Sequence, residues 1–545
     1  MRRLLILLLT ALVLLPTTTS AYWFEYSSIR ENMQLAPDTA WVGGPFASIP
    51  IAGEKSLLVV RMTNGVGNAY QIIDKYGGFE FSEYQQVSTE PYILGNLGPA
   101  SAESDSMGGA VVQWYRSDDE SVHAQKIDAQ GNRIWGDEGI CFMDWRRDIP
   151  IDYDFNTDGM GGFLYAYGTE NLYDTLRVIR YNQFGQSVWS EVGVDVCIHP
   201  YDKDNPKVSP DGEGGAYVAW QDNRPSDYYS LRLQHIDASG NPLWIHNGVL
   251  VNELIPFNHD PIPDGQGGVI ITCNQIIHRL DAFTGEELWR QTLDLTASGS
   301  KPQIVPGEPG YYYVGFTKFY PFQFRAQRFD LNGHFYWGDE FGRLVATYEN
   351  YLPSLGYEGE KNFVYKAPYF YAGLVFRHPE NIFDVAIVAQ KMDSEGNHLW
   401  GSGAQIASYE FGAIYWMHLN PQASANGGMA IVWFESGDDK LWGKHVNPDG
   451  ALGGPIFPPP VEKKPGQITA NVNVSGLSFT LHTATHVTID LFNILGQQVQ
   501  TISEGFRQAG SYSIQLDERN LASGVYLARL QAGSETKVVK IAVVR

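Results

Sequence analysis

The sequence predicts an all-β chain in which a β-propeller of eight blades, with seven as the alternative, precedes a small Ig-like β-sandwich. Three observations lead to this prediction. Glycine is abundant, with 57 copies among 545 residues, while only 18% of the residues are charged. Many short stretches alternate apolar and polar residues, which is typical of strands. An internal repeat of 53 residues runs through most of the chain, and such a period indicates stacked structural units.

A Gly-Gly pair marks the first part of each repeat. Its first glycine stands at Gly108, Gly161, Gly214 and Gly267, in steps of 53 residues. Five residues after the second glycine stands a large side chain or a cysteine. Because Trp, Tyr and Cys share this position, we expect it to be a packing position between blades and not a sugar platform. Its members are Trp114, Tyr167, Trp220, Cys273 and Trp433.

A turn marks the second part of each repeat, as in IDASGNPLW, which ends at Trp244. An Asp or Asn opens it, a glycine follows and a tryptophan usually ends it. Each unit therefore predicts a four-stranded antiparallel sheet, and radial stacking of such sheets gives a propeller. We expect the segment 41–50 to close the ring by joining the last blade. The opening residues are Asp74, Asp128, Asn182, Asp237, Asp281, Asp330, Asp393 and Asn447.

Composition narrows the function classes. The net charge of −23 repels phosphate backbones, so we expect no nucleic-acid partner. Three cysteines, Cys141, Cys197 and Cys273, form no metal motif. We expect buried free thiols, with a Cys141–Cys197 bridge as the alternative.

The N-terminus predicts a secretory signal peptide over residues 1–21. Two arginines precede an apolar run from Leu4 to Leu15, and small residues allow cleavage after Ala21. The run is too short to span a membrane, and we expect no transmembrane segment elsewhere. The predicted propeller then extends over residues 22–456.

A proline-rich stretch over 457–466 predicts a stiff linker before a last domain over 467–545. That domain contains LFNILGQQVQTI, then LASGVYLARLQAG and finally KVVKIAVVR at the chain end. With these motifs in this order it resembles the type A C-terminal sorting domain of the type IX (Por) secretion system. The residues that carry the resemblance are Gly496, Gly510, Gly524, Tyr526, Lys540 and Arg545.

The resemblance implies a route and partners. The chain would cross the outer membrane of a Gram-negative-type bacterium through the type IX machinery. A sortase-like peptidase would remove the tail, leaving the protein at the outer cell surface or secreted.

Chemistry is harder to predict. Asp154, Asn156 and Asp158 space oxygen atoms as the start of a calcium loop does, although the later ligands of such a loop are missing and a plain Asp-Gly turn is the alternative. No other cofactor is expected. No nucleophile elbow, zinc-protease motif or P-loop occurs in the sequence.

Two further resemblances concern the propeller. The stretch HRLDAFTGEELWR, from His278 to Arg290, is similar to the repeat of quinoprotein-type propellers, and IDASGNPLW resembles the Asp-box turn of sialidase-like propellers. Both imply fold more than activity. A sialidase-like site would need an arginine cluster, for which Arg116, Arg224 and Arg325 are candidates. Pairing of such arginines with Asp118 or Asp222 is the simpler interpretation.

These observations leave three hypotheses open. The first is a non-enzymatic surface propeller that binds a protein or a glycan. The second is an exported polysaccharide hydrolase, marked by an acidic or Tyr/Arg cluster that irregular blades contribute and that meets at the central channel. The segment 368–384 is the apparent insertion to inspect. The third is a structural component of a surface layer.

Overall fold

The computed structural model divides the chain into two compact units, Met1–Pro455 and Ile456–Arg545. Each unit is described by itself. The structure describes residues 33–35, 47–62, 67–88, 101–116, 120–144, 150–169, 175–225, 229–253, 259–293, 302–318, 322–348, 351–353, 362–381, 384–409, 419–423, 427–435, 440–453, 468–473, 476–481, 485–493, 498–508, 510–515, 521, 524–532 and 535–543. The predicted signal peptide, Ala21 and the linker lie outside these residues.

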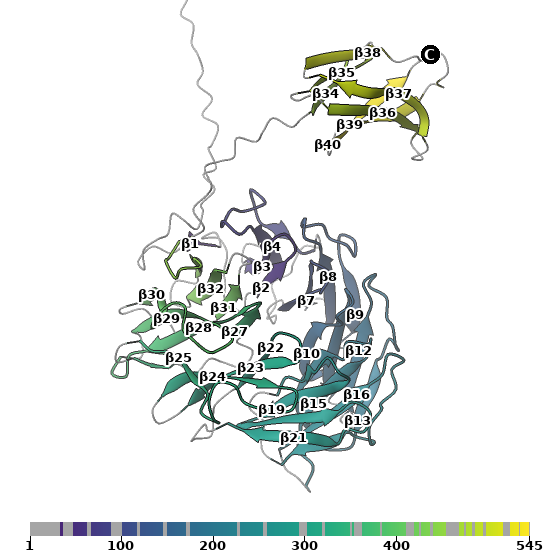
Figure 1. Cartoon of the computed structure of the whole chain (residues 1–545). Helices are drawn as coiled ribbons and strands as arrows, with labels where there is room; N and C mark the ends of the chain where they lie inside the picture. The colour runs from purple at the N-terminus through teal and green to yellow at the C-terminus, as the bar shows by residue number, and fades with distance from the viewer. Residues whose placement is uncertain are drawn as a thin grey trace, which may run out of the picture. The chain divides into compact units, whose positions relative to one another are not determined.

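Eight antiparallel sheets form a ring in the first unit (Figure 1). Blade 1 contains β2 (Ala47–Ile51), β3 (Lys55–Met62), β4 (Gly67–Ile73) and β5 (Gln85–Gln86). Blade 2 contains β6 (Ser101–Ser104), β7 (Ala110–Arg116), β8 (Ser121–Ile127) and β9 (Ile140–Asp144). Blade 3 contains β10 (Pro150–Thr157), β11 (Phe163–Thr169), β12 (Thr175–Tyr181) and β13 (Val194–Ile198). Blade 4 contains β14 (Lys203–Pro210), β15 (Ala216–Asp222), β16 (Ser230–Ile236) and β17 (Val249–Asn252).

The second half of the ring follows the same plan. Blade 5 contains β18 (Ile262–Pro263), β19 (Gly268–Cys273), β20 (Ile276–Asp281) and β21 (Glu287–Thr292). Blade 6 contains β22 (Gln303–Pro306), β23 (Tyr311–Lys318), β24 (Gln323–Asp330) and β25 (Arg343–Ala346). Blade 7 contains β26 (Leu352–Pro353), β27 (Phe363–Lys366), β28 (Tyr369–Arg377), β29 (Val385–Met392) and β30 (Ala404–Tyr409). Blade 8 contains β31 (Leu419–Ala423), β32 (Met429–Glu435) and β33 (Lys440–Val446), completed by β1 (Met33–Gln34).

The prediction of an eight-bladed propeller is therefore confirmed, but two details of it are wrong. The ring closes because β1 pairs with β33 through Met33 and Gly443, so the N-terminal strand completes the last blade. The segment 41–50, predicted to do this, instead contributes Ala47–Pro50 to the first strand of blade 1. The apparent insertion 368–384 is also no insertion, because it supplies β28, the central strand of blade 7.

Both repeated motifs form turns at one end of the ring. The Gly-Gly motif joins the first and second strands of a blade, and the Asp/Asn motif joins the third and fourth. In an antiparallel sheet these two turns lie at the same end. We call this the turn end, and the opposite end, where the other connections lie, the loop end.

The tryptophan of each Asp/Asn turn links its blade to the next one. Six indole Nε1–H groups donate to a backbone carbonyl in the following blade's turn, over 2.7 to 3.1 Å. In blade 1, which lacks this tryptophan, the Tyr70 hydroxyl donates to the carbonyl of Gly131 at 2.7 Å. The donors and acceptors are Trp135 and Gln183, Trp189 and Ala238, Trp244 and Ala282, Trp289 and Leu331, Trp337 and Ser394, and Trp400 and Pro448.

The turn glycine packs against the indole that the preceding blade provides. A Cβ on Gly285 would lie 2.8 Å from the Trp244 ring and 2.9 Å from Val249. Gly285 also has a φ of +71°, in the left-handed region that favours glycine. The repeat therefore keeps glycine for two reasons, backbone conformation and close contact between blades.

A buried glutamine on the third strand, which the sequence interpretation missed, supports the turn in five blades. Gln234, for example, accepts the backbone N–H of Trp244 at 3.1 Å and donates to the carbonyl of Ile245 at 3.2 Å. The signal was present, because a Gln stands ten residues before the tryptophan in four copies. The five glutamines are Gln71, Gln125, Gln234, Gln327 and Gln390.

The predicted packing position is confirmed. Trp220, Trp433 and Cys273 have no exposed surface, and Tyr167 and Trp114 are also buried. All three cysteines are free. The expectation of buried thiols holds for Cys197 and Cys273 but is wrong for Cys141, which is exposed.

The second unit consists of two sheets that share one core. The first contains β34 (Ile468–Asn473), β35 (Gly476–Leu481) and β38 (Gly510–Gln515). The second contains β37 (Gln498–Arg507), β36 (Thr485–Asn493), β39 (Gly524–Ala532) and β40 (Glu535–Val543). Phe479 and Leu481 pack with Val487 and Ile489 between the two sheets. The unit is therefore a small β-sandwich, whereas its Ig-like topology stays a prediction.

The contact between turn glycine and indole predicts a difference between two substitutions in blade 5. Gly285→Ala and Gly265→Ala both place a Cβ at positive φ, at a cost of about 1–2 kcal/mol each. Only Gly285→Ala also crowds Trp244, and this overpacking should cost a further ~1–3 kcal/mol. Urea unfolding followed by tryptophan fluorescence measures the difference. Equal destabilisation by the two substitutions would contradict the packing role.

Candidate binding surface

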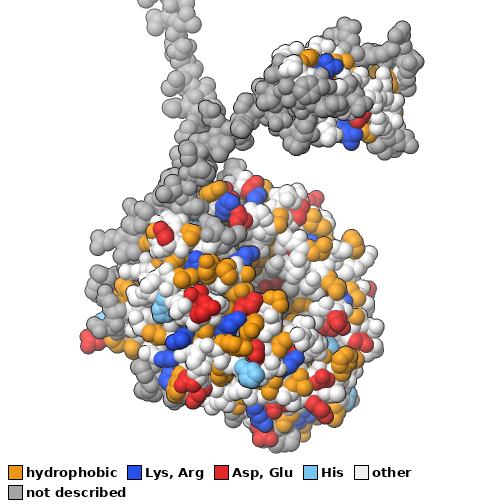
Figure 2. All heavy atoms as spheres, in the orientation of Figure 1, with side chains coloured by type: hydrophobic (Ala, Val, Ile, Leu, Met, Phe, Trp, Pro, Cys, Tyr) orange, Lys and Arg blue, Asp and Glu red, His pale blue; other side chains and the backbone are white. Residues whose placement is uncertain are grey.

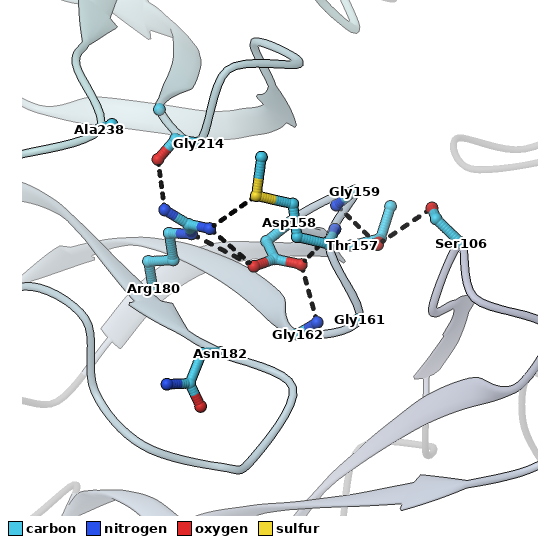
Figure 3. A network of polar contacts seen from close by, with 12 residues as sticks. Ser106, Thr157, Asp158, Gly159, Gly161, Gly162, Arg180, Asn182, Gly214 and Ala238 are labelled. Carbon is cyan, nitrogen blue, oxygen red and sulfur yellow. Dashed lines mark hydrogen bonds and ion pairs between the residues drawn. The ribbon is translucent and has the colours of Figure 1, made fainter.

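The calcium candidates lie at the turn end and on the inner strand of blade 3, among protein hydrogen-bond donors. Asp158 accepts the backbone N–H groups of Met160 and Gly162 and pairs with Arg180 at 3.1 Å. Figure 3 shows that Arg180 also reaches the carbonyl of Gly214 in the next blade. Asp158 therefore has a structural role between blades.

The other two candidates contact the neighbouring inner strand. Asp154 accepts the backbone N–H of Val208 at 2.9 Å, while Asn156 donates to the carbonyl of Val208 at 2.8 Å. Burial raises the pKa of Asp154 to about 6, although Lys207 lies 3.6 Å away. A calcium ion would have to compete with these contacts, and its binding stays a prediction.

The same contact between an Asp and a basic side chain recurs in four consecutive blades. A buried Asp of the Gly-Gly turn pairs with a basic side chain of its own blade, and that side chain donates to a carbonyl of the next blade. The four acids of these pairs thus stabilise the ring. The pairs are Asp105 with Lys126, Asp158 with Arg180, Asp211 with His235 and Asp264 with Arg279.

A cluster of Cys197, His199 and Asp222 lies at the loop end between blades 3 and 4. Their potential ligand atoms are all within 4.8 Å of one another. Arg224 donates to Asp222 at 2.7 Å and Trp220 donates to it at 2.8 Å. Burial acts to raise the pKa of Asp222, but the hydrogen bonds from His199, Arg224 and Trp220 outweigh it and hold this pKa far below its usual value.

The contacts of this cluster favour a structural role. His199 accepts the backbone N–H of Tyr201 through Nδ1 at 3.2 Å, and its Nε2 lies 3.0 Å from Asp222 and 2.9 Å from Arg224. Both ring nitrogens of His199 are therefore engaged by protein groups other than the thiol. Burial also raises the pKa of Cys197 to about 12, so the thiol stays protonated and is a poor nucleophile or metal ligand.

The candidate arginines of a sialidase-like site belong to three different blades. Arg116 ends β7, Arg224 follows β15 and Arg325 lies on β24. Arg224 pairs with Asp222, as the simpler interpretation predicts. Arg325 donates to the backbone carbonyls of Phe341 and Gly342.

A cleft of about 570 Å³ separates the outer strands of blades 4 and 5. Buried His278 lies in its wall, donates through Nδ1 to Glu287 at 2.7 Å and accepts from Asn252 through Nε2 at 3.1 Å. Burial lowers the pKa of His278. Both ring nitrogens are therefore occupied in a neutral imidazole, so His278 is not free to act as a general base.

A partly exposed aromatic cluster lies at the turn end of blade 6. We call Glu308, Tyr311, Arg328 and Tyr336 the blade 6 patch. The guanidinium carbon of Arg328 lies 3.9 Å from the ring centre of Tyr311 and 5.0 Å from that of Tyr336. The two tyrosine rings meet edge to face, with centroids 5.4 Å apart and an angle of 73°. Tyr336 is 45% exposed, so the patch presents aromatic surface to solvent.

Glu308 fixes the position of Arg328 in the patch. It accepts Nε of Arg328 at 3.0 Å and the hydroxyl of Tyr313 at 3.0 Å. Burial acts to raise its pKa, but a hydrogen bond from its own backbone N–H and those from Arg328, Tyr313 and Tyr365 outweigh burial and keep this pKa below the usual range. Tyr365 comes from β27 of blade 7 and stacks on Tyr313 with centroids 5.1 Å apart.

The blade 6 patch combines tyrosine and arginine, as the hydrolase hypothesis requires of a cluster at the central channel, but its chemistry suits binding better. The tyrosine that contacts the carboxylate, Tyr313, is 1% exposed, and burial raises its pKa. A nucleophile needs an accessible oxygen and a lowered pKa. An ionised Glu308 and an exposed Tyr336 instead provide an acceptor and an apolar face.

Sequence comparison identifies the second unit. Residues 456–544 match the family model described as the secretion system C-terminal sorting domain. The C-terminal unit is a type IX sorting domain. It indicates export through type IX secretion to the cell surface or outside the cell. A search of curated proteins gave no match.

Several solved structures are similar to the chain at low identity. Puromycin hydrolase shares 13% identity with this chain at a TM-score of 0.39. The match covers 75% of this chain and 62% of that enzyme. PorZ, a surface component of the type IX system of Porphyromonas gingivalis, shares 10% identity at a TM-score of 0.23 over 92% of this chain and 82% of its own. The WD40 domain of SCAP from fission yeast shares 10% identity at a TM-score of 0.39, over 76% and 98%. These scores are too low to support an argument about function.

The residues predicted to carry the sorting motif are placed as follows. Gly510 opens β38, Gly524 opens β39, and Tyr526 is buried in the core of the sandwich. Lys540 lies on β40 opposite Leu527. Gly496 and Arg545 lie outside the described residues. Their individual roles in sorting stay predictions.

Within the described part of the chain, no helix is long and apolar enough to cross a membrane.

The loop-end cluster predicts a large effect of Asp222→Asn. This change leaves Arg224 without its charge partner, and breaking such a buried pair should cost about 3–5 kcal/mol near neutral pH. Because the pKa of Asp222 is depressed in the folded state, its contribution is complete above about pH 4 and decreases as pH falls toward that lower value. Thermal unfolding from pH 7 to pH 3 measures it.

Asp137→Asn is the matched control. Asp137 also pairs with an arginine, at 2.7 Å, but its side chain is 76% exposed. An exposed pair contributes at most about 1 kcal/mol. A loss from Asp222→Asn no larger than that from Asp137→Asn would contradict the buried role.

Proposed function

We propose that this chain is an exported surface protein whose propeller is a non-enzymatic binding module. One observation carries the proposal. The polar side chains of the repeats are occupied in holding blades together, while the blade 6 patch presents exposed aromatic and charged groups that hold one another in place.

The chemistry of the described clusters supports binding over covalent catalysis. The thiol of Cys197 is protonated and buried, both nitrogens of His278 are occupied, and the hydroxyl of Tyr313 is buried. A nucleophile or general base would need the opposite properties.

The electrostatics of the surface suit a neutral or basic ligand. The net charge is −23. Figure 2 shows acidic, basic and hydrophobic side chains interspersed over one face of the ring. Surfaces of this mixed kind bind through local groups and not through one extended field of a single sign.

We further propose the route of export. The leader over residues 1–21 directs the chain across the inner membrane and is cleaved after Ala21, so that the mature chain begins at Tyr22. The sorting domain then engages the type IX machinery, and a sortase-like peptidase removes it.

Deletion of residues 467–545 tests the sorting role. We expect the truncated protein to accumulate in the periplasm, because its leader remains while its sorting domain is lost. Fractionation and surface proteolysis of intact cells measure its location. As a control, residues 456–545 fused to a carrier protein with a signal peptide should bring that carrier to the surface. Normal surface display of the truncated chain would contradict the assignment.

A panel of glycans and peptides, offered to the full mature chain, tests the binding role. We expect retention of at least one member without chemical change. Hydrolysis of any polysaccharide in the panel, measured as new reducing ends, would contradict the non-enzymatic proposal.

A further inference from the structure

Blade 6 departs from the repeat at two positions that meet in space. In blades 2 to 5 the backbone N–H that opens the first turn donates to the carbonyl of the second glycine. In blade 6 the equivalent bond runs from Gly307 to the carbonyl of Tyr311, over 3.0 Å. Tyr311 therefore stands where four other blades have Gly109, Gly162, Gly215 and Gly268.

This replacement needs a rebuilt turn. A Cβ on Gly162 would lie 1.9 Å from the carbonyl oxygen of Tyr181, and one on Gly215 would lie 2.1 Å from that of Ile236. Tyr311 fits only because the blade 6 turn differs, with its own N–H donating to the carbonyl of Glu308 at 2.8 Å. Packing of the ring does not require this change, since four blades do without it.

The second departure is at the residue before the tryptophan. Its backbone N–H donates to the carbonyl of the basic residue on the third strand, as Leu243 does to His235 and Tyr336 does to Arg328. Where the structure describes this position before a tryptophan, it is exposed and aliphatic except in blade 6, which has Tyr336. The aliphatic members are Ile134, Val188, Leu243, Leu288 and Leu399.

The two tyrosines that distinguish blade 6, Tyr311 and Tyr336, both contact Arg328. In blades 2 to 5 and 7 the equivalent basic side chain donates to a carbonyl of the next blade, as Lys126 and Lys391 do. Arg328 instead stacks on Tyr311 and bonds Glu308. A guanidinium has five N–H donors, so Arg328 keeps donors beyond the two that Glu308 takes.

We propose that the blade 6 patch is a carbohydrate-binding site for a neutral glycan. The apolar C–H face of a pyranose ring stacks on an exposed aromatic ring, and its hydroxyls need nearby donors and acceptors. Tyr336 offers the ring and Arg328 the donors. The Tyr336 hydroxyl donates to Asp330 at 3.1 Å, so its oxygen can still accept a hydrogen bond from the glycan. The net charge of −23 disfavours acidic glycans.

This inference rests on the proposed binding function and names its ligand class. The test uses hexasaccharides of β-glucan, xylan, mannan and chitin, an oligogalacturonate and a set of peptides, titrated calorimetrically into the full mature chain. We expect at least one neutral hexasaccharide to bind and the oligogalacturonate to give no heat.

Two variants take residues from other blades and should therefore fold. Tyr336→Leu introduces the residue of blades 4, 5 and 7, and Arg328→Lys introduces that of blades 2 and 7. Each should weaken hexasaccharide binding about tenfold or more. Leu399→Ala changes the equivalent position of blade 7, which is 40% exposed, and should leave binding unchanged. Thermal unfolding of all variants confirms folding.

The outcomes separate the two proposals. Unchanged hexasaccharide binding by Tyr336→Leu, preferential binding of oligogalacturonate, or binding of peptides alone would overturn the carbohydrate site but leave the binding function standing. No binding to any member of the panel would overturn both.

Discussion

The ring depends on one contact that passes from blade to blade. Each indole donates its N–H to the next blade's turn and lies against the glycine of that turn. A four-stranded sheet has two faces to cover, and one blade alone leaves both exposed. The indole solves this at the turn end, because it fills the space between two blades and also satisfies a backbone carbonyl. The buried Asp-to-base pairs add a second link of the same direction in blades 2 to 5. Blade 8 has no such tryptophan to pass on, and the ring closes there by strand pairing through Met33 and Gln34.

The structural role of the repeat residues limits the positions that can bind a ligand. A residue that serves the repeat is held by its neighbours, so changing it destabilises the ring. Function therefore belongs at positions where one blade departs from the others without loss of packing. Tyr311 and Tyr336 are such positions, since the first replaces a glycine and the second an aliphatic side chain. His278 is a further departure, because it stands where Gln234 stands in blade 4, yet both of its nitrogens are occupied. The C-terminal unit has a different function, because it belongs to a family of sorting domains that direct a protein's export.

Much of the fold was predictable because the repeated positions require residues with a particular backbone conformation or side-chain size. The Asp or Asn that opens each turn, the glycine at positive φ and the large indole leave a regular trace in the sequence. The closing strand left none, because Met33 and Gln34 pair through backbone groups that any residue provides. Sequence also could not show that Asp158 faces Arg180 and not a cation, since Arg180 lies 22 residues away in the chain. The blade 6 patch was missed for the same reason. Its residues come from two strands and two turns, and only the pairing of β23 with β24 brings them together.

Hydrogen exchange of Trp244→Leu compared with the parent chain tests the central claim most directly. If the indole couples blades, backbone amides of the turn Asp281–Gly285 in blade 5 should exchange faster in the variant, together with those of blade 4. Faster exchange confined to peptides of blade 4, with the blade 5 turn unchanged, would show that the blades are held by other contacts and would contradict the account.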